Sequence, residues 1–282
     1  MSRLRIDAHQ HFWNLARAEY PWLTPALGAL YRSIEPPELE PQLRAANIAR
    51  TVLVQAANSS ADTAFMLEQA ARYDWIGAVV GWVPLLDASQ AARALDETYL
   101  RHSKFRGVRH LIHDEPDPDW IVQPRALDGL RVLETRGLVY EIVAAFPRHL
   151  KHVPQLAETF PRLTFVVDHL AKPRIRVREF EPWAAQMRAA ARHPNVCAKI
   201  SGLATEADWA AWTWRDLKPY MDFAIAEFGA SRVMWGSDWP VCTLATSYAR
   251  WVEESQRALE EYGAADLDMI WGGTAARVYN IT

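Results

Sequence analysis

Cysteine is almost absent from this chain of 282 residues, which contains only Cys197 and Cys242. Two thiols cannot form the disulfide framework of a small secreted protein, and neither belongs to a Cys-x-x-Cys pair. Long hydrophobic runs are also missing, because no apolar stretch approaches the roughly 18 residues that span a bilayer. The chain enters the strand-like run Leu4–Ala8 without the apolar region of a signal peptide. We therefore expect a cytoplasmic protein without a membrane partner.

An excess of basic charge is missing as well. The chain has 31 Lys and Arg against 34 Asp and Glu, a formal net charge of −3, with no block of like charges. Nucleic-acid binding needs a basic surface, so we expect no nucleic-acid partner and a small, weakly charged substrate instead. Neither a Gly-x-Gly-x-x-Gly pattern nor a P-loop occurs, which argues against nucleotide binding. These observations leave open whether the chain forms a homo-oligomer.

Short apolar runs alternate with amphipathic helical patterns along the whole chain. The predicted strands are Leu4–Ala8, Thr51–Gln55, Ile76–Trp82, Phe105–Arg109, Leu138–Val143, Leu163–Val167, Val196–Ile200 and Arg232–Gly236. The predicted helices are Asp62–Tyr73, Ala88–Leu100, Arg125–Arg136, Arg148–Phe160, Phe180–His193, Asp216–Phe228, Ser247–Tyr262 and Ala265–Tyr279. Such alternation predicts an α/β fold of parallel strands joined by crossover helices. Eight units in under 300 residues favour a distorted TIM (β/α)8 barrel, with residues 1–282 forming a single domain.

One long segment, Phe12–Pro37, shows no regular pattern and follows the first predicted strand. It is rich in aromatic residues, among them Trp13, Tyr20, Trp22 and Tyr31. Long loops after barrel strands usually cover the carboxyl end of the barrel, where active sites lie. We therefore predict that this segment is a lid loop.

Three histidines and one aspartate stand where predicted strands end. His9 and His11 close the first strand, and residues two apart on a strand point the same way. His169 follows the sixth strand and Asp238 the eighth, so all four are expected at the catalytic end of the barrel. They could bind one divalent metal, typically Zn²⁺, or form a metal-free hydrolytic site. The alternative is that they are ordinary structural histidines and a turn aspartate.

Four motifs around these residues resemble the amidohydrolase superfamily, of the amidohydrolase-2 type. They are Asp-Ala-His9-Gln-His11-Phe-Trp, Val-Asp-His169-Leu-Ala-Lys-Pro, Gly-Ser-Asp238-Trp-Pro and Gly-Gly-Thr274-Ala-Ala-Arg-Val-Tyr279. More narrowly, Tyr20-Pro-Trp-Leu-Thr-Pro-Ala-Leu with Leu30-Tyr-Arg32 is similar to the sugar-lactonase branch, which includes L-fuconolactonase-like and L-rhamnonolactonase-like enzymes. The resemblance covers nearly the whole chain.

The resemblance implies a carbohydrate-catabolic hydrolase that opens a sugar-acid lactone to its hydroxy acid. Asp238 would be the general base for water, and His9, His11 and His169 would polarise the carbonyl or hold one metal. Binuclear relatives use a Lys or Glu at the end of the fourth strand, but here that strand ends Gly107-Val-Arg109-His110. We therefore expect a single metal ion, such as zinc, or a metal-independent enzyme.

Further polar and aromatic residues near strand ends or in the lid segment are candidates for substrate binding. They are Trp13, Trp22, Arg32, Gln55, Trp82, Arg109, Glu141, Lys199 and Trp239. For Glu141 and Lys199, an ion pair inside the barrel is the alternative. The remaining histidines are expected to be ordinary surface residues: His102, His110, His113, His149, His152 and His193.

Two other functions fit the same residues. One is metal-dependent decarboxylation or hydrolysis of an aromatic carboxylic acid, which would require a tightly bound metal. The other is a carbohydrate-binding barrel without catalysis, in which the tryptophans would stack on sugar rings. A carboxylate facing three imidazoles has no purpose in a simple binding protein, so lactone hydrolysis is preferred.

Overall fold

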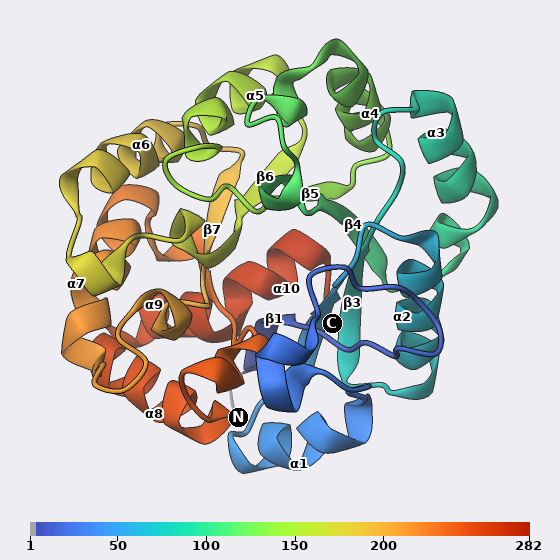
Figure 1. The fold of residues 1–282 in the computed structure, drawn as a ribbon. Coiled ribbons are helices and arrows are strands. Elements are labelled where there is room, and N and C mark those ends of the chain that lie inside the picture. Colours follow the sequence, from blue (N-terminus) through green and yellow to red (C-terminus); the bar gives the residue numbers. More distant parts are fainter. Residues whose placement is uncertain (1–3) are drawn as a thin grey trace.

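Residues 4–282 form a barrel of eight parallel strands surrounded by helices, as a computed structural model shows (Figure 1). The strands are β1 Ile6–Gln10, β2 Arg50–Val54, β3 Ile76–Gly81, β4 Phe105–His110, β5 Val139–Ile142, β6 Thr164–Val167, β7 Val196–Ile200 and β8 Val233–Trp235. They are hydrogen-bonded in chain order, each parallel to the next. A parallel bridge between Gln10 and Trp239 brings the last strand back to the first. The predicted TIM barrel is confirmed.

The predicted strand boundaries agree with the structure to within one residue except at β1. The prediction for β7 matches the structure residue for residue, whereas β1 begins and ends two residues later than expected. Every residue of β1 is buried, including Asp7, His9 and Gln10. Because these three side chains are polar, a hydrophobicity pattern does not indicate the full extent of the strand. As a consequence, His9 lies inside the strand and only His11 lies beyond its end.

Ten α-helices are formed by the described residues. They are α1 Pro36–Ala45, α2 Ser60–Arg72, α3 Ala88–Glu97, α4 Pro124–Thr135, α5 Val153–Thr159, α6 Glu181–Ala191, α7 Trp214–Phe228, α8 Tyr248–Leu259, α9 Ala264–Asp268 and α10 Thr274–Tyr279. Local capping explains several starts: the Ser59 hydroxyl accepts from two backbone N–H groups of α2, and Thr213 with Asp216 forms a capping box at α7.

Three helix predictions were wrong or incomplete. Helix α1 was missed because it opens with two prolines and contains Pro41. Helix α5 begins at Val153, later than predicted, after a short 3₁₀ turn. The long final helix is divided into α9, a π-helical turn at Met269–Gly273, and α10. Within this turn Gly272 lets the backbone approach Leu4 too closely for any side chain.

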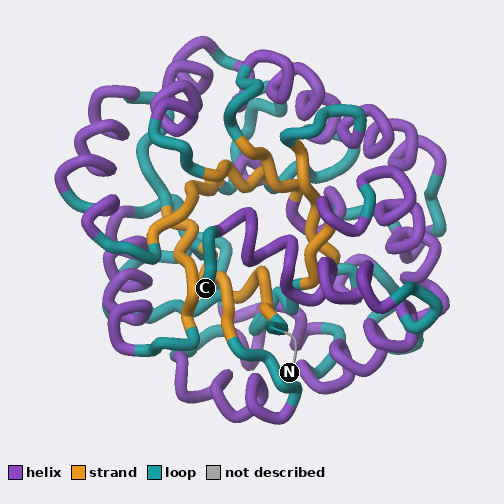
Figure 2. The backbone as a smooth tube through the Cα atoms, turned by 180° about the vertical axis from the view of Figure 1, so that it is seen from behind, coloured by secondary structure: helices purple, strands orange, loops and turns teal. Residues whose placement is uncertain are grey.

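The last helix, α10, lies across the end of the barrel that is nearer the viewer in Figure 2. Its residues Ala275 and Tyr279 pack with apolar strand residues such as Ile6 and Val52. The Tyr279 hydroxyl donates a hydrogen bond to Glu141 inside the barrel. Helix α10 therefore closes the amino end and leaves the carboxyl end open for a site.

The segment between β1 and α1 packs over the carboxyl end of the barrel. Trp22 lies edge-to-face on the buried Trp13, with ring centroids 5.3 Å apart, and donates through Nε1 to the Ala56 carbonyl at 2.6 Å. Whether this segment moves as a lid stays a prediction. Across residues 4–282, no helix has both the length and the apolar character to cross a membrane.

Candidate active site

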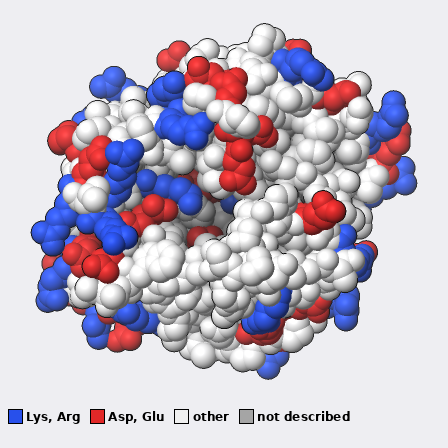
Figure 3. Space-filling model, viewed as in Figure 1, with Lys and Arg blue, Asp and Glu red and all other residues white. Residues whose placement is uncertain are grey.

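The carboxyl ends of the strands surround a cavity of about 160 Å³. Figure 3, which looks onto this face, shows the hollow near its middle. Its polar wall is formed by His11, Arg109, His113, His169, Lys172 and Asp238, and its apolar wall includes Trp22, Leu111, Val143 and Val241. These residues come from five different strand ends or the loops after them, which is where barrel enzymes place their active sites.

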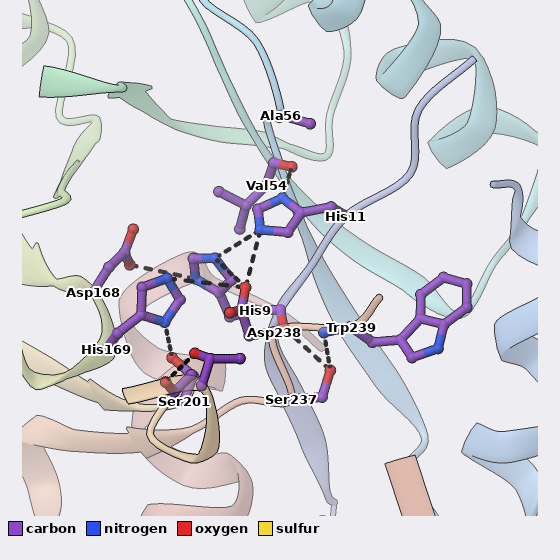
Figure 4. A network of polar contacts seen from close by, with 12 residues as sticks. His9, His11, Val54, Ala56, Asp168, His169, Ser201, Ser237, Asp238 and Trp239 are labelled. Atoms are coloured by element: carbon purple, nitrogen blue, oxygen red, sulfur yellow. Dashed lines mark hydrogen bonds and ion pairs between the residues drawn. The ribbon is translucent and has the colours of Figure 1, made fainter. Parts of the chain in front are cut away.

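Four side chains predicted from the sequence meet beside this cavity (Figure 4). The Nε2 atoms of His9 and His11 are 3.1 Å apart. Oδ1 of Asp238 lies 3.3 Å from His11 Nε2, 3.8 Å from His9 Nε2 and 3.9 Å from His169 Nε2. The Asp238 carboxylate therefore lies among three imidazole nitrogens, although the four residues come from β1 and from the segments after β6 and β8.

Asp238 is held in place by β1. Its backbone has a left-handed φ of 58°, and its N–H donates to the His9 carbonyl at 2.7 Å. The buried Asp7 carboxylate accepts the backbone N–H groups of Ser237 at 2.8 Å and His9 at 3.1 Å. One aspartate below the site therefore fixes both the strand that carries His9 and the turn that carries Asp238.

A left-handed turn after β6 carries His169. The four residues His169, Leu170, Ala171 and Lys172 have φ values of 54°, 47°, 61° and 54°, which are costly for residues with a Cβ atom. Buried hydrogen bonds hold the turn, among them Trp183 Nε1 donating to the Leu170 carbonyl at 2.6 Å. Backbone strain of this kind is concentrated at functional sites.

The residues after β7 complete the surroundings of His169. Ser201 Oγ lies 2.9 Å from His169 Nδ1 and orients the ring. The next residue, Gly202, has a φ of +62°, and a Cβ atom there would lie 2.7 Å from His169 Nδ1. A glycine is therefore required both by the backbone conformation and by the closeness of the imidazole.

Hydrogen bonding fixes the proton on His11. Its Nδ1 lies 2.7 Å from the Val54 carbonyl, and since a carbonyl only accepts, Nδ1 must donate. In the neutral ring Nε2 then carries a lone pair, which faces the Asp238 carboxylate. His11 consequently cannot donate a proton or a hydrogen bond toward the cavity while it is neutral.

The protonation of Asp238 and His169 follows from their surroundings. Burial would raise the pKa of Asp238, but His169, His11 and His9 outweigh burial and hold that pKa below its usual range. Burial lowers the pKa of His169 to about 4, with partial compensation from Asp238. At neutral pH the site therefore contains an ionised carboxylate beside a neutral imidazole.

A layer of buried charges lies next to His9. Lys199 Nζ is 2.6 Å from Glu141 Oε1 and 3.0 Å from His9 Nδ1. Arg109 Nη1 is 3.1 Å from Asp168 Oδ2. Glu141 and Lys199 are fully buried and paired with each other, as the alternative interpretation of their sequence positions expected. The four charges of this layer compensate one another inside the barrel, and the layer holds the His9 ring in place.

The residues around Asp238 fit one divalent metal ion. His9 Nε2, His11 Nε2 and Asp238 Oδ1 lie 3.1 to 3.8 Å apart, close to the roughly 3.4 Å expected between ligands of a tetrahedral zinc ion. The lone pair on His11 Nε2 suits a ligand, and Asp168 Oδ1, 3.3 Å from His9 Nδ1, can orient His9 from behind. Arg109 Nη1 also lies 3.3 Å from His9 Nε2 and can occupy that lone pair when metal is absent.

Of the nine side chains predicted to bind substrate, Trp22 and Arg109 line the cavity. Gln55, Glu141 and Lys199 are fully buried, and Trp13 and Trp239 belong to the hydrophobic core. Trp82 donates through Nε1 to His110 Nδ1 at 3.0 Å. Arg32 pairs on the surface with Glu38 at 2.6 Å.

The expectation that six histidines are ordinary surface residues was wrong for four of them. His110, His149 and His152 are buried, and His113 lines the cavity. Lys172 also lines the cavity and was not predicted to do so, although it stands three residues after His169. Lys172 reaches the cavity because of the left-handed turn. The sequence gives no signal for this turn, since it contains no glycine there.

Comparison with known proteins agrees with this geometry. A family model described as Amidohydrolase matches residues 6–281. The chain is 38% identical to the L-fucono-1,5-lactonase of Burkholderia ambifaria, over 98% of this chain and 96% of that protein. It is also 38% identical to the L-fucono-1,5-lactonase of Burkholderia multivorans, over 99% and 97% of the two chains.

A solved structure of an amidohydrolase from Burkholderia multivorans with bound zinc is similar over the whole fold. Its TM-score is 0.91 at 37% sequence identity, and the match covers 99% of this chain and 100% of that one. Together with the family model and the two relatives, this shows that the chain belongs to the amidohydrolase family.

Proposed function

We propose that this protein is a lactonase that hydrolyses a sugar-acid lactone of the L-fucono-1,5-lactone type to the open hydroxy acid. The observation that carries the proposal is the ionised Asp238 carboxylate, surrounded by three imidazoles at the wall of a small cavity. The two relatives with 38% identity over nearly the full chain carry this activity in their names.

Asp238 acts as the general base. Because its pKa is held low, the carboxylate is available over the whole neutral range to accept a proton from water. As the water oxygen bonds to the lactone carbonyl carbon, the proton moves to Asp238. When the ring C–O bond breaks, the same proton passes to the departing ring oxygen, which becomes the new hydroxyl group of the open acid, and the Asp238 carboxylate is regenerated.

Two cationic donors, Arg109 and Lys172, line the cavity. In its neutral form His11 donates its one N–H to the Val54 carbonyl and has none to offer the substrate. Arg109 Nη1 lies 3.3 Å from His9 Nε2, beside the residues around Asp238, so stabilisation of the developing oxyanion is assigned to Arg109. His9, His11 and Asp238 would hold one zinc ion, which when bound supplies Lewis-acid polarisation of the carbonyl. His169, fixed by Ser201, keeps the carboxylate oriented toward the cavity.

The apolar wall suits the carbon face of a sugar ring. Trp22 is pinned by its hydrogen bond to Ala56 and presents a rigid indole. Aromatic faces pack well against the C–H groups of sugars. A small cavity with one polar and one apolar wall therefore favours a single lactone ring over a larger substrate.

The test is a lactone panel with Asp238→Asn. The wild-type protein should release acid from aldono-1,5-lactones in weak buffer faster than the blank. Asp238→Asn should lower kcat at least about 1,000-fold, since it removes the base, while retaining ligand affinity. Asp119→Asn, a surface change at a residue paired with Lys151 and His152, is the control and should keep wild-type kcat.

Each negative result points to another function. No acceleration with any five- or six-membered lactone would refute the proposal. Inactivity on lactones with tightly retained zinc would favour decarboxylation or hydrolysis of an aromatic acid. Sugar binding without turnover in every assay would favour a binding protein. Assays before and after chelation decide whether the metal is needed.

A further inference from the structure

Two polar side chains of the cavity wall have no part in the mechanism above. His113 follows β4 and Lys172 follows β6, and both line the cavity together with His169 and Asp238. Because this cavity has a volume of only about 160 Å³, one small ligand can reach both side chains. The cavity therefore has a second polar region besides the one that contains Asp238.

The left-handed turn carries Lys172 to this position. The Lys172 N–H donates to the His169 carbonyl at 2.8 Å, which closes a turn of about three residues. In such a turn side chains three apart lie on the same side, and both His169 and Lys172 line the cavity. Lys172 Nζ lies 3.5 Å from Glu206 Oε1 and has three N–H donors, so it keeps donors for a ligand.

His113 is held by anchored neighbours. The Leu111 N–H donates to Asn58 Oδ1 at 2.8 Å, and His110 stacks on Trp120 with ring centroids 4.0 Å apart. His113 Nδ1 is buried, and within residues 4–282 it has no hydrogen-bond partner. Buried polar atoms are rarely left unpaired, so a ligand atom is a natural partner for this nitrogen.

The state of the His113 ring follows from its surroundings. Burial, with help from Lys172 and Arg109, lowers the pKa of His113 to about 3, so the imidazole is neutral at pH 7. Asp114 Oδ1 lies 3.5 Å from Nε2 and favours a proton there. Nδ1 then carries a lone pair and accepts a hydrogen bond.

We propose that His113 and Lys172 bind ring hydroxyl groups of the lactone and so select polyhydroxylated, uncharged substrates. A hydroxyl both donates and accepts, which matches an imidazole acceptor beside an ammonium donor. The cations of the cavity wall are already compensated, Arg109 by Asp168 at 3.1 Å and Lys172 by Glu206 at 3.5 Å. A dicarboxylate substrate would need uncompensated positive charge in the cavity wall. This inference rests on the proposed lactonase activity.

The experiment compares kcat/KM for L-fucono-1,5-lactone and for δ-valerolactone, which has no ring hydroxyls. His113→Phe and Lys172→Met should each lose about 10- to 100-fold on the hydroxylated lactone and less than about threefold on δ-valerolactone. Lys151→Met, at a surface lysine paired with Asp119, is the matched control and should lose nothing on either. If δ-valerolactone turns over too slowly, its inhibition constant serves for the same comparison.

The outcomes separate this inference from the proposed function. Equal losses on both lactones, or no loss on the hydroxylated one, overturn the hydroxyl-binding role and leave the lactonase assignment intact. Lys172→Arg, which keeps the charge, should recover part of the activity on the hydroxylated lactone, and equal loss in Lys172→Arg and Lys172→Met counts against the inference. A wild-type protein that hydrolyses neither lactone refutes the proposed function, and the inference falls with it.

Discussion

Replacing Gly202 by alanine should reduce catalysis far more than stability. The new Cβ atom would lie 2.7 Å from His169 Nδ1, 2.9 Å from its Cγ and 3.1 Å from Asp238 Oδ2, whereas ordinary contacts begin near 3.4 Å. The methyl group would thus press on two of the four residues around the proposed catalytic water. Neither side chain can turn freely, because both are buried, His169 is hydrogen-bonded to Ser201, and the Asp238 carboxylate lies among three imidazoles.

The size of the effect follows from these distances. To reach ordinary contact the His169 ring must move away by about 0.7 Å, and displacements near 1 Å in an active site cost about 100-fold in rate. The left-handed φ of +62° adds about 1–2 kcal/mol of backbone strain for alanine. We therefore expect kcat/KM to fall by roughly 30- to 100-fold and the free energy of unfolding to fall by only a few kcal/mol.

A matched control is available at Gly137. It has the same left-handed backbone, with a φ of +63°, but a Cβ atom there would meet no atom of the described chain within 4 Å. Gly137→Ala should lower the melting temperature by a few degrees and leave kcat/KM unchanged. Measurements of lactone hydrolysis and thermal unfolding for both variants test whether Gly202→Ala affects catalysis more than stability. If Gly202→Ala keeps kcat/KM within threefold of Gly137→Ala, His169 is not the steric target or does not position the catalytic residues.

Three further predictions concern pH, buried charge and metal. His113 has a pKa of about 3 in the folded chain against about 6.5 when unfolded, so only the unfolded chain takes up its proton as pH falls below 6.5. Through this group the free energy of unfolding should fall by about 2 kcal/mol between pH 7.5 and pH 5. In urea unfolding, His113→Gln should therefore be less destabilising at pH 5 than at pH 7.5 by that amount. An equal effect of the substitution at both pH values would contradict this. Lys199→Met should cost about 3–5 kcal/mol because it leaves the buried Glu141 carboxyl without its partner, so that this group must take up a proton or remain an uncompensated charge, whereas adding Glu141→Leu should restore part of the loss. Simple additivity in that double-mutant cycle would show that the pair is not coupled. Finally, His11→Ala should weaken zinc binding to chelator-treated protein by at least about 100-fold in a titration, and unchanged affinity would exclude His11 as a ligand.

The barrel could be predicted because its strands are buried on both faces and therefore stand out as apolar runs. Val196–Ile200 illustrates this, since the predicted and observed β7 agree. The same rule failed at β1, where Asp7, His9 and Gln10 are buried together with the apolar residues. Their burial is compensated by partners more than 40 residues away in the sequence, such as Ser237 for Asp7 and Thr51 for Gln10. A local pattern contains no information about such partners.

The candidate site could be predicted only in part, for a related reason. His9, His11, His169 and Asp238 follow from a simple rule, that polar residues at the carboxyl ends of barrel strands face the mouth. The second polar region does not follow from it. Lys172 reaches the cavity only because four consecutive non-glycine residues adopt a left-handed conformation that local preferences oppose.

The left-handed turn persists because the surrounding structure offsets its cost. Trp183 donates to the Leu170 carbonyl at 2.6 Å, and the Phe146 N–H donates to the Ala171 carbonyl at 2.8 Å, so relaxing the backbone would leave buried polar groups unpaired. The charged layer next to His9 follows the same logic, since each of its charges is tolerable only beside the others. Sequence patterns therefore failed where tertiary contacts override local preference, and these are the places that carry the proposed chemistry.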